Sequence, residues 1–239
     1  MSANRRMVEY DIDGSAYDGL LTLPKSQSGA SPAVMVCHAW GGRKEHEEQA
    51  AERIAELGYV GFAADVYGVG RRGETPEESE ALMTPLLADR ETLRTRLLAA
   101  IGQLKAQEEV DVDQVVIAGY CFGGLCAIDM ARINAPVLGA AAFHSIFGTE
   151  GTEGPDITPK VIAFQGYDDP MADPDAQRAF TDEMTARNAD WQMHLYGGVA
   201  HSFTNRLAND PANGLKYDVT ADARSWAAFE NFLAEIFGS

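Results

Sequence analysis

The chain has 239 residues and a formal net charge of −17, from 19 basic and 36 acidic side chains. This length suits one α/β domain with a substantial core. The acidic balance argues against nucleic acid or an anionic membrane as a partner, and no apolar run approaches the roughly 18 residues of a membrane span. No apolar stretch follows Arg5 and Arg6, so no secretory signal is expected.

The three cysteines have no metal-ligand spacing, and their number is odd. This pattern favours reduced thiols in a cytoplasmic setting. We therefore expect neither a disulfide framework nor a structural metal site.

Strand-like and helix-like segments alternate along the chain, which predicts a mostly parallel central sheet with helices on both faces. No linker or repeat interrupts the alternation, so a single domain over residues 1–239 is expected. Strands are expected at 7–12, 16–23, 33–37, 60–64, 115–118, 139–143, 161–165 and 192–196. Helices are expected at 45–57, from Thr75-Pro76, at 90–106, from near Phe122, from Asp173-Pro174 and at 221–237.

The most informative segment is Gly119-Tyr120-Cys121-Phe122-Gly123-Gly124, directly behind the apolar run 115–118. Glycines two residues before and after Cys121 are what a nucleophile elbow requires, because a Cβ there would collide with the neighbouring strand or helix. Cys121 is therefore the predicted nucleophile. The alternative is a buried, inert thiol in a glycine-rich turn.

A nucleophile elbow requires an acid after a later strand and then a histidine, in that order. Gly166-Tyr167-Asp168-Asp169-Pro170 follows the seventh predicted strand, and His201 follows the last one. The spacing puts Asp169 at the acid position, with Asp168 as the nearby alternative. The order Cys121, acid, His201 is that of an α/β-hydrolase.

The roles of these residues follow from their chemistry. His201 is expected to take the thiol proton, and Asp169 to orient the imidazole and stabilise its charged form. The N–H of Phe122 is expected to be one oxyanion donor. The second is expected from the loop after strand 33–37, at Ala39, Trp40 or Gly41, of which Trp40 is the chosen candidate.

Four other histidines compete with His201 for a functional role. His46 and His194 lie inside a predicted helix and a predicted strand, so they are expected to be structural. His38 and His144 each end a predicted strand, which makes them candidates for the lining of a pocket. Only His201 combines a late loop position with a flanking Gly-Gly pair.

With these residues in place, the chain resembles the dienelactone hydrolase family, the carboxymethylenebutenolidases and their relatives. The resemblance covers nearly the whole chain and rests on His38-Ala39-Trp40-Gly41-Gly42, on 57–60 with 64–68, on 119–124 and on Gly198-Val199-Ala200-His201-Ser202-Phe203. It implies an α/β-hydrolase fold and hydrolysis of a lactone or ester through an acyl-thiol on Cys121, without metal or cofactor. The expected partner is a small-molecule substrate, and the expected assembly is a monomer or homodimer.

Two features depart from the family pattern. Well-studied members carry a glutamate in the oxyanion loop that helps to activate the cysteine, and here that position is Ala39. Members that act on dienelactone also hold the substrate carboxylate with arginines. Arg206 lies one residue from the expected place, and Arg71 and Arg72 are candidates for another arginine. These arginines and His38 are candidate substrate-binding residues.

Three other functions remain open at this point. One is a general carboxylesterase or thioesterase on the same scaffold. Another is a weakly catalytic member of the family that binds its ligand without turnover. The third is a thiol redox protein in which Cys126 would pair with Cys121, although no Cys-x-x-Cys motif is present.

Overall fold

The computed structural model describes residues 4–26 and 29–238. It divides into two compact units, Met1–Ala118 and Gly119–Ser239. The boundary falls inside a long strand, immediately before the proposed elbow. The expectation of a single domain over 1–239 stays a prediction.

Every strand predicted in the first unit is present. The strands of this unit are β1 (Asn4–Ile12), β2 (Ser15–Leu23), β3 (Ser31–Cys37), β4 (Val60–Ala64) and most of β5 (Val110–Tyr120). β1 pairs antiparallel with β2, β2 pairs antiparallel with β4, and β4 pairs parallel with β3. Residues 33–37 are at most 1% exposed, so this continuous apolar run is buried on both faces as predicted.

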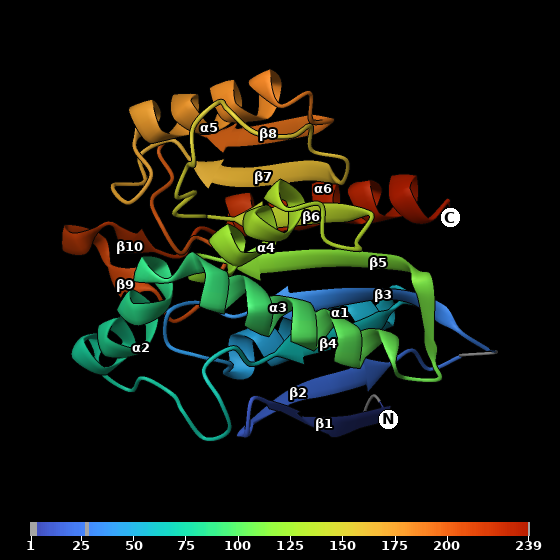
Figure 1. Ribbon diagram of the computed structural model, residues 1–239. Coiled ribbons are helices and arrows are strands. Elements are labelled where there is room, and N and C mark those ends of the chain that lie inside the picture. The colour runs from blue at the N-terminus through green and yellow to red at the C-terminus, as the bar shows by residue number, and fades with distance from the viewer. Residues whose placement is uncertain (1–3, 27–28, 239) are drawn as a thin grey trace. The chain divides into compact units, whose positions relative to one another are not determined.

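Three helices cover the first unit, and they begin where the sequence predicts. They are α1 (Glu45–Glu56), α2 (Pro76–Ala88) and α3 (Arg90–Lys105). The Thr75 side chain accepts a hydrogen bond from Glu78 N, and the Glu78 carboxylate accepts one from Thr75 N, a capping box that fixes the start of α2. In Figure 1, α3 crosses in front of the strands of this unit while α1 lies behind them.

The second unit repeats the alternation of helix and strand. Its elements are α4 (Phe122–Arg132), β6 (Gly139–Phe143), β7 (Lys160–Gly166), α5 (Pro174–Ala186), β8 (Trp191–Tyr196), β9 (Asn209–Asp210), the 3₁₀ helix η1 (Pro211–Asn213), β10 (Leu215–Lys216) and α6 (Val219–Phe237). β6, β7 and β8 pair in parallel. The loops that follow these three strands therefore lie at one edge of the sheet, where α/β proteins hold their chemistry.

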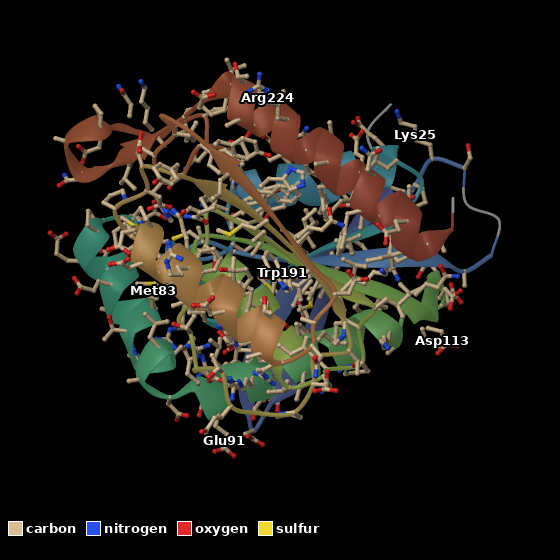
Figure 2. The ribbon with its side chains drawn as sticks, turned by 90° about the horizontal axis from the view of Figure 1, so that it is seen from above. Lys25, Met83, Glu91, Asp113, Trp191 and Arg224 are labelled. Carbon is tan, nitrogen blue, oxygen red and sulfur yellow. The ribbon has the colours of Figure 1, made fainter. Side chains whose placement is uncertain are left out.

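Helices cover both faces of the sheet in the second unit as well. Figure 2 shows α5 and α6 on opposite sides of β8, which starts at Trp191, with Arg224 of α6 pointing away from the strand. Trp226, Phe229 and Leu233 of α6 are buried, as the helical spacing of these residues predicts.

Most of the pairings described between long strands within the two units are parallel. The predicted fold class, an α/β-hydrolase with a mostly parallel sheet, is therefore confirmed. The small β9–β10 hairpin is absent from the prediction, because Asn-Asp-Pro-Ala-Asn-Gly has the composition of a turn and not of strands. In the described part of the chain, no helix is both long enough and apolar enough to cross a membrane.

Candidate active site

Cys121 occupies a strained turn between β5 and α4. Its backbone has φ 55° and ψ −114°, a conformation that side chains other than glycine rarely adopt. The amide of Cys121 donates to the Phe143 carbonyl of β6 at 2.9 Å, and only 8% of the residue is exposed. The residue is thus held rigidly at the N-terminus of α4, as a nucleophile elbow requires.

Glycine at position 119 has a direct steric cause. A Cβ on Gly119 would lie 2.0 Å from the carbonyl oxygen of Gly123, in the first turn of α4. No real contact is that short, so the strand and the helix approach each other this closely only because residue 119 has no side chain. The steric argument made from the sequence is confirmed at this glycine.

Asp169 lies in the loop after β7, and its carboxylate is fully engaged. Its Oδ2 accepts hydrogen bonds from His201 Nδ1 at 2.7 Å and from Gln165 Nε2 at 2.6 Å, and its Oδ1 accepts one from Met171 N at 2.8 Å. Asp169 is 1% exposed, whereas the neighbouring Asp168 is exposed. The geometry pairs Asp169, and not Asp168, with the histidine.

Gln165 is a site residue that the sequence analysis did not identify. It is fully buried near the end of β7 and holds the Asp169 oxygen that faces His201. The available signal was a polar residue at the end of a run of apolar strand residues. A buried amide there must find a hydrogen-bond partner, and the acid of the next loop is within reach.

The β9–β10 hairpin fixes the backbone of His201. His201 N donates to Gly214 O at 2.9 Å, and Lys216 N donates to His201 O at 3.0 Å. Since both backbone groups of His201 are held by one hairpin, only rotation of its side chain remains to be fixed. The residue is 1% exposed, and Asp169 holds its Nδ1 by a hydrogen bond.

The other ring nitrogen of His201 faces the thiol. Nε2 is buried, and it has no hydrogen bond of normal geometry to the described part of the chain. The Cys121 thiol nevertheless lies near enough to contribute a weak sulfur hydrogen bond to the pKa of His201. Burial alone lowers the pKa of His201. The charge of Cys121, the hydrogen bonds to Asp169 and Cys121, and the charge of Asp169 outweigh it and raise the pKa to about 10.

This arrangement favours a charged imidazole at His201. Long or imperfect hydrogen bonds between catalytic groups are common without substrate, which explains the loose Nε2 contact. The second unit thus brings together Cys121, Asp169 and His201, as well as Phe122, the first residue of α4. Phe122 N–H belongs to the N-terminal turn of the helix, whose amides lack intrahelical partners.

His38 lies in the first unit, at the end of β3, and both of its ring nitrogens are used within the chain. Nε2 accepts a hydrogen bond from Val66 N at 3.3 Å, so Nδ1 carries the proton and donates to Ala39 O at 2.7 Å. Burial lowers the pKa of His38 to about 4, against the charge of Asp65. These contacts describe an internal bridge; the role of His38 in substrate binding stays a prediction.

Trp40 lies in the loop after β3, and its neighbours are held firmly. The buried Glu47 of α1 accepts hydrogen bonds from Ala39 N at 3.1 Å and from Lys44 N at 3.0 Å. Tyr67 Oη donates to Trp40 O at 2.9 Å. Lys44 and Glu47 have the spacing of a helix cap. The oxyanion role of Trp40 stays a prediction.

The three arginines proposed for substrate binding have different surroundings. Arg72 is half-buried and donates to Asp65 Oδ2 at 3.1 Å and to Arg43 O at 2.5 Å. Arg71 is exposed, with Nη1 3.2 Å from Tyr67 O. Arg206 is exposed near the hydroxyl of Tyr217. Arg72 is thus committed to internal contacts, and the substrate-binding roles of all three stay predictions.

Within residues 4–26 and 29–238, no cluster of three or more His, Cys, Asp or Glu side chains could hold a metal ion. The three cysteines are buried free thiols.

Comparison with protein families gives a match to the dienelactone hydrolase family over residues 17–237. A Caenorhabditis elegans protein described as uncharacterized, K02A2.1, is 36% identical over 61% of this chain and 94% of its own length. A putative carboxymethylenebutenolidase of Aquifex aeolicus is 25% identical over 95% of this chain and 97% of its own length.

Solved structures agree with this match. A dienelactone hydrolase-like promiscuous phosphotriesterase from metagenomic libraries, P91, superposes with a TM-score of 0.92 at 33% identity, covering 99% of this chain and all of its own. Esterase 2 of Thermogutta terrifontis has a TM-score of 0.71 at 20% identity, over 97% of this chain and 94% of its own. At that identity the likeness concerns the fold alone.

Proposed function

Because this chain belongs to the dienelactone hydrolase family of α/β-hydrolases, we propose that it hydrolyses a small lactone or carboxylic ester through an acyl-enzyme on Cys121. Hydrolysis of the ester or lactone type is supported by the family and by relatives described as carboxymethylenebutenolidases. The cysteine mechanism is our own inference from the site. Its need for a reduced thiol fits the cytoplasmic setting proposed from the cysteines.

In the first half-reaction, the Cys121 thiolate attacks the substrate carbonyl carbon and forms a C–S bond. The carbonyl oxygen becomes an oxyanion, to which Phe122 N–H donates a hydrogen bond. The tetrahedral intermediate collapses, and the C–O bond to the leaving group breaks. His201 gives its proton to the departing alkoxide, which leaves a thioester on Cys121 and a neutral imidazole held by Asp169.

In the second half-reaction, neutral His201 takes a proton from water as the water oxygen attacks the thioester carbon. The C–S bond breaks, and Cys121 leaves as a thiolate beside the imidazolium. The product is a carboxylic acid, and a lactone yields acid and alcohol on one molecule. The starting ion pair is thereby restored without an external oxidant or metal.

The single observation that carries this proposal is the arrangement around His201. One ring nitrogen is bound to buried Asp169 at 2.7 Å, and the other faces the thiol at the strained elbow. A structural histidine needs neither a thiol partner nor a nucleophile at φ 55°.

The test is hydrolysis of a dienelactone and of an aryl acetate by the wild type, Cys121→Ala, His201→Ala and Cys126→Ala. We expect both activities to fall by about 10³-fold or more in Cys121→Ala and in His201→Ala. Cys126 is a buried free thiol five residues further on, in α4, and its removal is expected to leave the catalytic activity in place.

The outcomes separate the alternatives. Loss of activity on removal of Cys126, with His201 dispensable, would support the redox function instead. Ligand-induced stabilisation without turnover, retained in Cys121→Ala, would support a binding protein. Turnover of the acetate alone would retain the cysteine mechanism and exclude the lactone.

A second candidate reaction is phosphotriester hydrolysis. It is favoured by the likeness to the promiscuous phosphotriesterase P91, at 33% identity over nearly the whole chain. The same thiolate would attack phosphorus, expel the aryl oxide with the His201 proton, and leave a phosphothioester for water to cleave. Steady release of aryl alcohol from an aryl dialkyl phosphate, dependent on Cys121, supports this reaction. A single stoichiometric burst followed by inactivation contradicts it.

A further inference from the structure

His144 lies between the elbow and the His201 loop of the second unit. Its ring packs edge-to-face against the His201 ring, with centroids 5.0 Å apart and an interplanar angle of 69°. On other sides it meets Phe203 at 5.3 Å and Tyr120, the residue before Cys121, at 5.9 Å. Its Nε2 is 2.8 Å from the buried Thr204 hydroxyl. The residue is 2% exposed.

The backbone of His144 is strained and strongly held. Its φ is 38°, in the left-handed region that a non-glycine residue occupies at a cost. His144 N donates to Phe164 O of β7 at 2.8 Å, and the carbonyl of the preceding Phe143 accepts from Cys121 N at 2.9 Å. Strain of this kind persists only where the surroundings enforce it, and it is concentrated at functional sites.

We propose that His144 is a positioning residue that fixes the rotation of the His201 ring, so that Nε2 faces Cys121 while Nδ1 keeps Asp169. The backbone of His201 is already held by the β9–β10 hairpin, and Asp169 holds one ring nitrogen. A ring fixed at one atom still rotates about that hydrogen bond. The edge-to-face contact removes this freedom, and the Thr204 hydroxyl holds the ring that makes the contact.

The contact also requires His144 to be neutral. The titratable groups facing the His201 ring are Cys121 from the elbow, Asp169 from the loop after β7 and His144 from the end of β6; Tyr120 also faces His144. A cation on His144 would repel the imidazolium on His201 across 5.0 Å and weaken its pairing with the thiol. A neutral His144 ring keeps the contact without this repulsion.

The proposal rests on the proposed thiol–imidazole chemistry, but its test does not require a substrate. We would measure the rate of Cys121 alkylation by iodoacetamide against pH, which follows the thiolate paired with His201. His144→Leu removes the aromatic edge at similar volume, and His144→Phe retains a ring. His194→Leu is the matched control. His194 belongs to β8 and lies outside the site, and its ring packs on that of Phe164 with the centroids 5.3 Å apart.

We expect His144→Leu to move the alkylation profile to higher pH and to lower kcat about 10- to 100-fold with KM nearly unchanged, since the base is misaligned and binding is not. His144→Phe should restore most of the wild-type profile, and His194→Leu should not change it.

An unchanged alkylation profile in His144→Leu overturns the proposal, even if ester hydrolysis falls. So does a His144→Phe profile displaced as far as that of His144→Leu. If His144→Leu does not fold, Thr204→Val, which frees the His144 ring from its hydroxyl partner, must displace the profile in the same direction. Failure of the wild type to hydrolyse any ester, with the alkylation results as expected, would reject the proposed reaction and retain the positioning role.

Discussion

Two histidines, one in each unit, have nearly the same burial, but their pKa values are shifted in opposite directions. His38 and His201 are each 1% exposed, and each lies near a buried aspartate. His38 directly follows β3, and His201 lies in the loop after β8. The pKa of His38 is lowered to about 4, whereas that of His201 is raised to about 10. Burial is therefore not what distinguishes them.

The difference lies in what meets the two ring nitrogens. Asp169 binds His201 Nδ1 at 2.7 Å, and the other side of the ring faces a thiol that can carry charge. Around His38, Nε2 accepts a hydrogen bond from Val66 N, and the nearest Asp65 oxygen is 3.8 Å away.

Asp65 has other partners in the first unit. Its oxygens accept from Tyr67 N at 2.8 Å and from Arg72 at 3.1 Å. Burial then dominates the pKa of His38, because Asp65 shares its charge with these other partners. In this protein, the buried histidine with the raised pKa is the one whose ring nitrogens meet Asp169 and the Cys121 thiol.

The largest expected effect comes from neutralising the two aspartates in turn. Asp169→Asn should lower kcat by about 10³- to 10⁴-fold, because the amide no longer stabilises the imidazolium and permits the wrong tautomer. Asp65→Asn should mainly lower the free energy of unfolding, by about 2 to 4 kcal/mol, since Arg72 loses a buried charged partner. Steady-state kinetics and urea unfolding of both variants measure these effects. Similar losses of kcat in the two would contradict the comparison.

The next effect is a pH dependence of stability with opposite signs for the two histidines. The lowered pKa of His38 contributes stability that is fully present above about pH 6.5 and is lost as pH falls towards 4. That loss amounts to about 3 kcal/mol. The raised pKa of His201 contributes stability that is present below about pH 6.5 and is lost as pH rises through about 10.

Urea unfolding between pH 4 and 10 tests this difference in the wild type, His38→Gln and His201→Gln. The variant at position 38 should flatten the acid side of the stability curve, and the variant at 201 the alkaline side. If His38→Gln leaves the acid limb as steep as in the wild type, another group controls it.

A smaller effect is expected at Glu47, a buried carboxylate that extends the comparison to the loop after β3. Burial raises its pKa, and its two oxygens accept from Ala39 N and Lys44 N. In Glu47→Gln, one of these amides would face an NH₂ group, which cannot accept a hydrogen bond. We expect a loss of about 1 to 2 kcal/mol in urea unfolding. Exposed Glu45→Gln, on the same turn of α1, is the control and should be silent.

The smallest effect is expected at Asp168. This carboxylate is exposed beside the buried Asp169, so Asp168→Asn should change kcat less than about twofold. A loss comparable with that of Asp169→Asn would show that the two acids share the role.

Most element positions follow from local patterns in the sequence. Strands 60–64 and 139–143 have the predicted bounds, because the turn residues on either side of a short apolar run set both ends of the buried strand. β5 is longer than predicted, starting at Val110 and not at residue 115, because its first part is only partly buried and mixes apolar with polar residues.

The sequence alone determines the elbow at Cys121, the chain order of nucleophile, acid and histidine, and the need for glycine at 119, because these depend on residues near one another in the chain. The tertiary structure decides which of two adjacent aspartates meets His201, the pairing of Gln165 with that acid, and the protonation of His38. Those outcomes depend on distances of a few ångströms between segments far apart in sequence, and electrostatic energies change steeply over such distances.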